Sequence, residues 1–462
     1  MAHTRREFLN RGTAFTLGFA GLSSLYARHK TLASALEASD TGFGPLIRDP
    51  RGIIDLPAGF TYSTFSRAGE EMDDGFLLPG KHDGMAAFRG ENNRVILVRN
   101  HEMDATDVAL GPFGADNARL SKLAPDRMFD AGGGRAPELG GTTTVVYNQL
   151  TGKVERQFMS LFGTARNCAG GPTPWNSWLT CEETALTKGE GREHDHGWVF
   201  EVPAGATGAV KPEPITAMGR FRHEAVAFDP RSGAVYQTED VADAGLYRYL
   251  PKERTRLLAG GRLQALCVAD RATLDTRNWD KAHQTVKVGE KLRVRWVDLV
   301  NVEAPKDDLR TQAQSKGGAI FARCEGIWYG DSCAYFASTS GGSSEMGQLW
   351  KYTPSQAEGT PDEEKNPGIL ELMLEVHDSK VLNNADNLTV APWGDLIVCE
   401  DGDGANGLVG VTPDGIPYRL AMTRVNTSET AGACFSPDGS TLFMNIQHPG
   451  LTLAIRGPWK KR

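Results

Sequence analysis

The chain has 462 residues and a formal net charge of −8, so it is long enough for a large core, and its charge argues against nucleic acid as a partner. Its 53 glycines and 24 prolines are typical of many short strands joined by turns and argue against a mainly helical protein. A bare acidic surface would also repel an anionic substrate.

The N-terminus predicts an export signal. Arg5 and Arg6 stand in the segment HTRREFLNRG, ahead of an uncharged run that is as long as a signal core and too short to span a bilayer. Twin arginines in a bacterial leader mark the twin-arginine (Tat) route, and residues 33–35 (ASA) offer a cleavage site. The alternative is a cytosolic basic helix.

We therefore expect residues 1–35 to be a Tat signal peptide that engages the Tat translocase during export. Residues 36–462 are expected to form one domain, periplasmic or secreted. No later apolar run is long enough to span a membrane, so we expect no stable membrane insertion of the mature chain. Because Tat exports folded proteins, often with cofactors inserted, the leader is also a reason to look for metals.

Six segments have the pattern of a hairpin, with a turn of Pro, Gly, Asn or Asp between two apolar strands. In chain order they are 87–102, 172–183, 227–240, 328–340, 390–401 and 435–446. They predict an all-β fold, a six-bladed β-propeller with loop and helix insertions. Residues 59–66 (GFTYSTFS) are expected to supply the strand that closes the ring. A two-sheet sandwich is the alternative, although it seldom needs six equivalent hairpins.

An acidic or polar residue stands shortly before each hairpin turn. Four lie six residues before the turn and two lie at slightly longer offsets: Asp83, Glu224, Glu325 and Asp386, then Asn167 and Glu429. If the blades are related by rotation, equivalent positions form a ring about the axis. These side chains would then point toward one channel.

The second strands of several hairpins end in acids. Aligning TCEE, VCED, QTED and RNHE gives one column of Glu183, Asp401, Asp240 and Glu102, and a neighbouring column of Glu182, Glu400, Glu239 and His101. Because side chains alternate faces along a strand, both columns cannot face the channel. Either Cys181 and Glu183 face inward together or Glu182 does so alone, unless the strand end is irregular.

A ring of close carboxylates needs compensation, because like charges raise one another's pKa values and an unpaired buried carboxylate is costly. Protonation, arginine pairing or metal ions can relieve it, and the acids outnumber the nearby arginines Arg99, Arg222 and Arg323. We therefore expect metal ions. Carboxylate oxygens suit Ca²⁺, whereas a thiolate such as that of Cys181 calls for iron or zinc. Bound cations would also allow an acidic protein to attract an anion.

Seven cysteines, an odd number, leave at least one thiol unpaired or bound to something else. Their spacing shows no CxxC zinc pattern. Cys324 and Cys333 flank one hairpin and are candidates for a disulfide, whereas Cys399 is expected to pack in a core. The segment REHDHGW (192–198) is only a weak zinc signal.

Four strings resemble the PhoX-type alkaline phosphatase family. They are NHE (100–102), NCAGGPTPWNSWLTCEE (167–183), GRFRHEAVAFDP (219–230) and LFMNIQHPG (442–450). The resemblance covers nearly the whole mature chain and includes the Tat leader. It implies a six-bladed propeller whose central funnel holds Ca²⁺ and Fe³⁺ and cleaves phosphomonoesters.

Carried over residue by residue, the resemblance implies that Cys181 is the iron thiolate ligand, that Arg323 binds phosphate and that Asn167 is a further polar contact. It places the metal-binding acids at Glu102, Glu182, Glu224, Glu325, Asp386 and Glu429. The chain departs from the family in being shorter than its best-known members. It also has Cys324 where the family has a proline between the arginine and the glutamate.

Two other functions fit the same pattern. One is another calcium-dependent propeller hydrolase, such as a lactonase or a phytase-like enzyme. The other is a propeller that binds a ligand without catalysis. The Cys181–Glu182 pair, expected at the mouth of the channel, argues against a purely binding role.

Overall fold

The structure is a computed structural model that describes residues 42–460, so the predicted signal peptide lies outside the described residues. Strands dominate, and the one α-helix within residues 42–460 is α2 (Leu309–Ser315). Short 3-10 helices lie in the loops: η1 (Val108–Leu110), η2 (Ala118–Lys122), η3 (Pro125–Arg127), η4 (Gly132–Gly134), η5 (Thr216–Met218), η6 (Leu257–Ala259) and η7 (Pro361–Lys365). None of the described helices is long and apolar enough to cross a membrane.

The described strands form five hydrogen-bonded sheets. One sheet contains β4 (His82–Arg89), β5 (Arg94–His101), β6 (Gly140–Asn148) and β7 (Lys153–Thr164). The next contains β8 (Asn167–Pro172), β9 (Ser177–Glu182) and β10 (Val199–Pro203). A nine-stranded sheet runs in the order β11 (His223–Phe228), β12 (Val235–Glu239), β13 (Leu246–Pro251), β14 (Gly261–Val268), β15 (Lys291–Asp298), β19 (Ile369–Glu375), β18 (Gln348–Thr353), β17 (Cys333–Ser338) and β16 (Cys324–Gly330).

The last two sheets combine the two ends of the chain. One runs in the order β20 (Ala385–Val390), β21 (Leu396–Glu400), β22 (Gly407–Val411), β23 (Pro417–Thr423), β2 (Ile54–Pro57) and β1 (Leu46–Ile47). The other runs in the order β24 (Thr430–Phe435), β25 (Thr441–Ile446), β26 (Leu451–Arg456) and β3 (Thr61–Arg67). The closing strand predicted at residues 59–66 is therefore present as β3, paired with β26.

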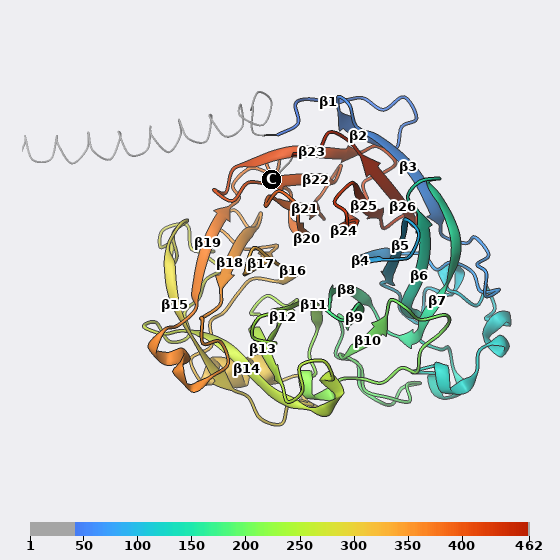
Figure 1. Cartoon of the computed structure of the whole chain (residues 1–462). Helices are drawn as coiled ribbons and strands as arrows, with labels where there is room; N and C mark the ends of the chain where they lie inside the picture. The colour runs from blue at the N-terminus through green and yellow to red at the C-terminus, as the bar shows by residue number, and fades with distance from the viewer. Residues whose placement is uncertain (1–41, 461–462) are drawn as a thin grey trace, which may run out of the picture.

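All six predicted hairpins are present as antiparallel pairs. They are β4–β5, β8–β9, β11–β12, β16–β17, β20–β21 and β24–β25. The first strand of each pair, here called the inner strand, lies next to a common axis, and Figure 1 shows the sheets radiating from this centre. Each inner strand contacts the next around the ring, and β24 contacts β4 to close it.

The prediction of an all-β, propeller-like fold is thus confirmed, and the sandwich alternative is wrong. The described strands form five sheets and not six, because β15 pairs with β19 and joins two groups of strands into the nine-stranded sheet. One of the expected insertions lies between β14 and β15, where residues 269–290 contain no named strand.

The inner strands approach one another so closely that two positions require glycine. A Cβ atom added at Gly84 would lie 2.5 Å from the Cα of Ala169, and one at Gly326 would lie 2.7 Å from the Cα of Asn387. Real Cβ atoms do not make contacts this short, so the missing side chains allow the strands to converge. Asp83 and Glu325, the residues directly before these glycines, are thereby brought toward the axis.

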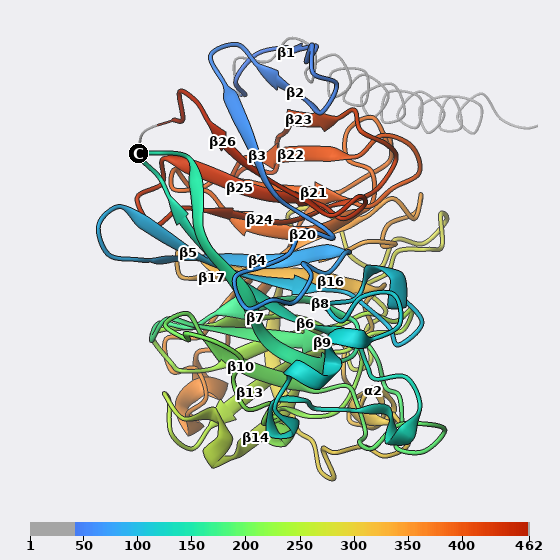
Figure 2. The same ribbon diagram turned by 90° about the vertical axis from the view of Figure 1, so that its right-hand side faces the viewer.

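Two long connections lie on the same side of the ring. The segment between β5 and β6, which carries η1–η4, and helix α2 both lie to the right in Figure 2. That segment begins where β5 ends, and the end of β5 pairs with the start of β4. This side is therefore the one at which β4 begins.

Candidate metal centre

Each inner strand carries an irregularity near its start. The pairing with its hairpin partner shifts after the first or second residue and leaves two residues unpaired. Such a bulge bends a strand and re-aims a side chain. We call the first unpaired residue the bulge position. The six bulge positions are Asp83, Cys168, Glu224, Glu325, Asp386 and Gly432.

Two further sets of residues accompany the bulges. The exit position directly follows the second strand of a hairpin, and the lead-in position directly precedes the inner strand. In every hairpin the exit N–H donates a hydrogen bond to the lead-in carbonyl. The exit positions are Glu102, Glu183, Asp240, Thr339, Asp401 and Gln447. The lead-in positions are Lys81, Arg166, Arg222, Arg323, Asn384 and Glu429.

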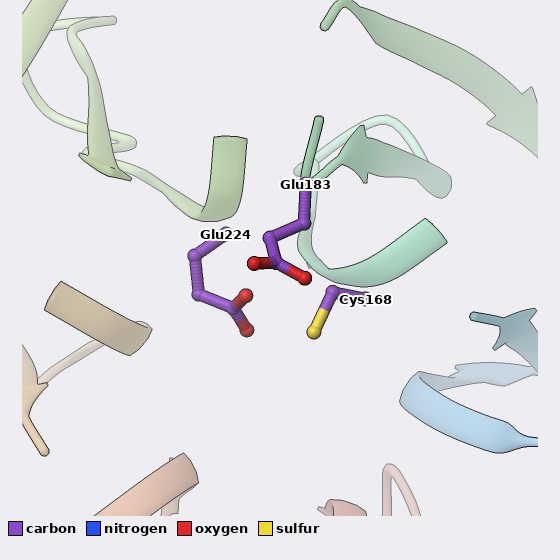
Figure 3. A group of neighbouring side chains, drawn as sticks. All are labelled: Cys168, Glu183 and Glu224. Atoms are coloured by element: carbon purple, nitrogen blue, oxygen red, sulfur yellow. The ribbon is translucent and has the colours of Figure 1, made fainter. Parts of the chain in front are cut away.

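Side chains from these positions converge in three groups. Within each group, one potential ligand atom per residue lies within 4.8 Å of the others. The groups are Asp83–Glu102–Glu429, Cys168–Glu183–Glu224 and Glu224–Glu325–Asp386. Figure 3 shows the carboxylates of Glu183 and Glu224 and the sulfur of Cys168 facing the same space. The structure thus brings together Glu102, Glu224, Glu325, Asp386 and Glu429, five of the seven predicted metal ligands.

Glu224 belongs to two of the groups and lacks compensation from the protein. Its side chain is fully buried, and within residues 42–460 neither carboxylate oxygen has a hydrogen-bond partner. Removing one partner from a buried ion pair is strongly destabilising, because an uncompensated charge remains. Cations held by the two groups would compensate Glu224 from both sides. The donors fit such ions, since carboxylate oxygens suit Ca²⁺ and the Cys168 sulfur suits iron.

The pKa values reflect the same crowding of negative charge. Burial raises the pKa of Glu183 and of Asp386 to about 8, and the charges of neighbouring carboxylates add to the rise. Burial and neighbouring acids raise the pKa well above its usual value for Asp83, Glu224, Glu325 and Glu429. Burial likewise raises the pKa of the Cys168 thiol. Binding of metal ions would displace these protons.

The cysteine of the centre is Cys168, whereas the sequence analysis placed Cys181 there. Cys181 is fully buried and packs with Leu179 and Val199 in the core. Cys168 is partly exposed, and its Sγ lies 3.9 Å from Oδ2 of Asp83. Within the described residues, Cys181 belongs to none of the three groups, whereas Glu183, two residues later, belongs to one of them.

Asn167 is also displaced from its predicted role. Its side chain is buried, its Oδ1 accepts a hydrogen bond from Thr164 at 2.5 Å, and its Nδ2 donates one to Thr180 at 2.9 Å. The bulge of β8 starts one residue later, so Cys168 occupies the position that Asn167 was expected to hold. A sequence signal for this exists, because a small residue directly follows five of the six bulge positions: Gly84, Ala169, Ala225, Gly326 and Ala433.

Arg323 lies beside the centre, as predicted. Its guanidinium forms a two-pronged contact with Asp240, through Nε to Oδ1 at 3.0 Å and Nη2 to Oδ2 at 2.7 Å. Nη2 also donates to Oε1 of Glu325 at 2.9 Å. The side chain is 43% exposed, so a charged group sits over the buried acids and still reaches solvent.

Glu182 was predicted to bind metal, but its carboxylate braces the backbone instead. Its Oε1 accepts from the N–H of Ala165 at 2.8 Å and contacts Nδ1 of His196 at 2.7 Å. Its Oε2 accepts from the N–H groups of Gly197 and Trp198 at 2.8 and 3.1 Å. Ala165 leads into β8 and Glu182 directly precedes Glu183, so this brace fixes the two segments that carry Cys168 and Glu183.

His196 supplies the positive charge of the brace. It is fully buried between Glu182 and Asp130, and its Nε2 lies 3.2 Å from Oδ2 of Asp130. Burial alone would lower the pKa of His196, but the charges and hydrogen bonds of the two acids raise it to about 10. The histidine is therefore a cation at neutral pH and not the zinc ligand that the segment REHDHGW weakly suggested.

Glu400 repeats this arrangement at the hairpin β20–β21. It accepts from the N–H of Asn383 at 2.9 Å and from that of Gly407 at 3.0 Å, and it pairs with Arg419. His101 braces the first hairpin in a related way, since its Nδ1 contacts the carbonyl of Gly80 at 2.8 Å. The column of Glu182, Glu400, Glu239 and His101 thus faces away from the axis, which the alternation of side chains along a strand allowed.

The candidate disulfide between Cys324 and Cys333 is absent, and all seven cysteines, each within the described residues, are free thiols. Cys324 pairs with Ser338 at one end of the hairpin, and Cys333 pairs with Gly330 at the other. Cys399 is fully buried in an apolar cluster, as expected.

Fold and site together define a propeller-like protein with a candidate metal centre on its axis. The family model of alkaline phosphatase PhoX matches residues 41–450, and the chain belongs to this family. It is therefore a phosphoric monoester hydrolase, which confirms the family and the activity expected from the sequence. Among curated proteins no sequence match is found.

One of the similar solved structures shows the same fold. The structure of Pseudomonas fluorescens PhoX in complex with vanadate, a transition-state analogue, aligns with a TM-score of 0.67 at 19% identity and covers 90% of this chain and 98% of that chain. A gluconolactonase from Xanthomonas campestris aligns with a TM-score of 0.42 at 13% identity, covering 91% and 99% of the two chains. Regucalcin from Agrobacterium tumefaciens gives 0.40 at 12% identity, covering 86% and 96%.

The raised pKa values predict that the metal-free protein loses stability as the pH rises. A carboxyl group with a raised pKa binds its proton more tightly when folded, so its contribution is complete below the ordinary pKa of 3.8 to 4.5. That contribution is lost as the pH passes the folded value, about 8 for Glu183 and Asp386. We expect the Tm of EGTA-treated protein to fall between about pH 5 and pH 8, with Ca²⁺ removing most of the fall. An equal Tm at both pH values would contradict this.

Replacing the brace residue Glu182 by glutamine should weaken metal binding without touching a ligand. Glu182→Gln keeps the shape of the side chain but removes the charge that holds His196, and it frees the segments carrying Cys168 and Glu183. Loss of such supporting contacts typically costs 10- to 100-fold in metal affinity, so we expect about this loss by titration with chelator.

The matched control is Glu358→Gln. Glu358 is also a buried acid, paired with Arg248 and hydrogen-bonded to Tyr236 and Tyr352, but it belongs to none of the three groups. This variant should lose stability and keep its metal affinity. Equal metal affinity in Glu182→Gln and the unaltered protein would show that the brace does not position the centre.

Proposed function

We propose that phosphomonoesters are hydrolysed at the axial centre and that the centre is loaded with Ca²⁺ and Fe³⁺. The observation that carries the proposal is Glu224, whose buried and unpartnered carboxylate is shared by two groups. Ca²⁺ suits the two all-oxygen groups. Iron suits the group that contains the Cys168 sulfur, because a thiolate is a soft ligand.

The frame that presents this centre is, in our proposal, a six-bladed propeller. The nine-stranded sheet contains two inner strands, β11 and β16, and the strand pairing that joins its two halves is that of β15 with β19. If the nine-stranded sheet is counted as two blades, the five sheets give six blades, one for each inner strand. The occurrence of one bulge, one lead-in and one exit position per inner strand supports this division.

Arg323 binds and orients the phosphoryl group of the substrate. Asp240 and Glu325 hold its guanidinium in a fixed plane beside the acids, and a planar fork suits two phosphate oxygens at once. The braces at Glu182 and Glu400 keep the acids in place while the charge on the phosphate changes. When bound, metal ions would offset the charge that develops on the phosphoryl oxygens and would activate water for attack.

Bound metal ions would allow this acidic protein to bind an anionic substrate. The protein is acidic overall, but multivalent cations in the centre would reverse the local field. Arg166 and Arg323, two of the lead-in residues, add positive charge beside the acids of the centre. A small phosphoester is therefore the expected partner, and nucleic acid is not.

We also propose that the chain is exported by the Tat pathway and acts in the periplasm or outside the cell. Arg5 and Arg6 ahead of an uncharged run support residues 1–35 as the signal, and residues 36–462 would then act as one phosphatase domain. A cofactor-loaded enzyme suits a route that carries folded proteins.

Metal removal should abolish the activity. We expect hydrolysis of p-nitrophenyl phosphate to fall to background after EGTA treatment and to return with Ca²⁺, because the acids need cations to act as a phosphate site. Elemental analysis of the purified protein should find calcium and iron. Full activity in metal-free protein would refute the proposal, and assays on a lactone and on phytate distinguish the two rival hydrolases.

Two cysteine variants serve as matched controls for the iron assignment. Cys168→Ser removes the only thiol in the three groups, so iron content and rate should both fall. Cys181→Ser changes a buried core thiol of the adjacent strand and should leave the iron content unchanged. Loss of iron in the second variant alone would restore Cys181 as the ligand.

Export is tested by replacing both Arg5 and Arg6 with lysine in the full-length chain. The Tat route depends on the arginine pair, so the unprocessed protein should accumulate in the cytoplasm of a bacterial host and phosphatase activity should leave the periplasmic fraction. Undiminished export of the variant would exclude the Tat assignment and would leave the assignment of the centre untouched.

A further inference from the structure

Arg166 and Arg323 both occupy lead-in positions, before β8 and β16. Arg222 occupies the lead-in position of β11, the inner strand between them. Both Arg166 and Arg323 have positive φ angles, 50° and 47°, which are uncommon outside glycine and turn the side chain in a particular direction. The two side chains are 42% and 43% exposed. The internal repeat therefore presents two arginines in the same way at the mouth of the centre.

The guanidinium N–H groups of Arg166 make longer contacts and fewer hydrogen bonds than those of Arg323. Its Nη2 lies 3.3 Å from Glu102 and 3.8 Å from Glu183, and its Nε lies 3.9 Å from Asp104. Within residues 42–460 this buried Nε has no hydrogen-bond partner. Arg323, by contrast, makes hydrogen bonds of 2.7 to 3.0 Å with Asp240 and Glu325.

The acids of the centre link the two arginines. Nη2 of Arg166 lies 3.8 Å from Oε2 of Glu183, and Nη2 of Arg323 donates to Glu325 at 2.9 Å. Glu224 shares one group with Glu183 and another with Glu325. An anion bound over these groups would therefore lie close to both arginines, and the Nε of Arg166, which lacks a hydrogen-bond partner, would gain an acceptor.

We propose that Arg166 is a second phosphate-binding residue, which with Arg323 forms a two-armed grip on the phosphoryl group. The proposal rests on the assignment of phosphomonoester hydrolysis to this centre. A phosphomonoester offers three terminal oxygens, enough for the forks of two arginines and for metal ions. Arg166 acts on substrate binding and is not a metal ligand.

The test compares Arg166→Gln, Arg323→Gln and Arg222→Gln in the metal-loaded mature protein. Arg222 is the matched control, because it holds the same lead-in position and is 41% exposed but lacks the positive φ and pairs with Asp307. The readouts are KM and kcat for p-nitrophenyl phosphate, the inhibition constant of inorganic phosphate, and metal content.

For Arg166→Gln we expect both KM and the inhibition constant of phosphate to rise about 10- to 100-fold, the loss that accompanies removal of charge-assisted hydrogen bonds. Metal content should stay unchanged, and Arg166→Lys should recover part of the affinity. Arg222→Gln should change either constant by less than about 2-fold.

Two results would overturn the inference. One is an Arg166→Gln variant that binds phosphate as tightly as Arg222→Gln does. The other is a loss of metal that accounts for the weaker binding, which would make Arg166 a structural counter-charge. If Arg323→Gln also binds phosphate normally, the assignment of the phosphate site itself fails, and the two failures are thereby told apart.

Discussion

The constraint on which the rest of the structure depends is the mutual repulsion of buried carboxylates around one axis. Asp83, Glu224, Glu325 and Asp386 are buried and project from the inner strands β4, β11, β16 and β20. The protein compensates their charge only in part, since Arg323 pairs with Glu325 but neither carboxylate oxygen of Glu224 has a hydrogen-bond partner in the described part of the chain. Burial of carboxylates without partners destabilises the metal-free protein. We therefore infer that the stable folded state includes bound cations.

The frame brings these charges together through backbone geometry. Five of the six bulges carry a side chain that they re-aim toward the axis, and each exit N–H ties the second strand to the lead-in of the first. Buried acids such as Glu182 and Glu400 then fasten the lead-in segments from behind. Acidic residues thus have two opposite roles within a single hairpin: Glu183 faces the centre, while Glu182, one residue earlier, serves as an internal acceptor for backbone N–H groups.

Much of the fold could be predicted from the sequence, because turn residues between apolar runs mark the hairpins directly. The closing strand at residues 59–66 and five of the acids could be placed for the same reason. The site was missed where the local geometry departs from a regular strand. The bulge position of β8 is Cys168 and not Asn167, and Glu183 joins the same group while Cys181 packs in the core. A period of two residues along a strand allows Glu183 to face inward while Glu182 faces away, but it cannot anticipate a bulge.

The closure of the ring also determines when the centre can be completed. The strand β3, near the start of the chain, pairs with β26 near its end, and β2 joins the edge of β23. Glu429 directly precedes β24, in the sheet that β3 and β26 complete. A nascent chain that still lacks its last strands therefore has most of the acids but no finished enclosure for them. The full set of ligands is therefore enclosed only when β3 has paired with β26.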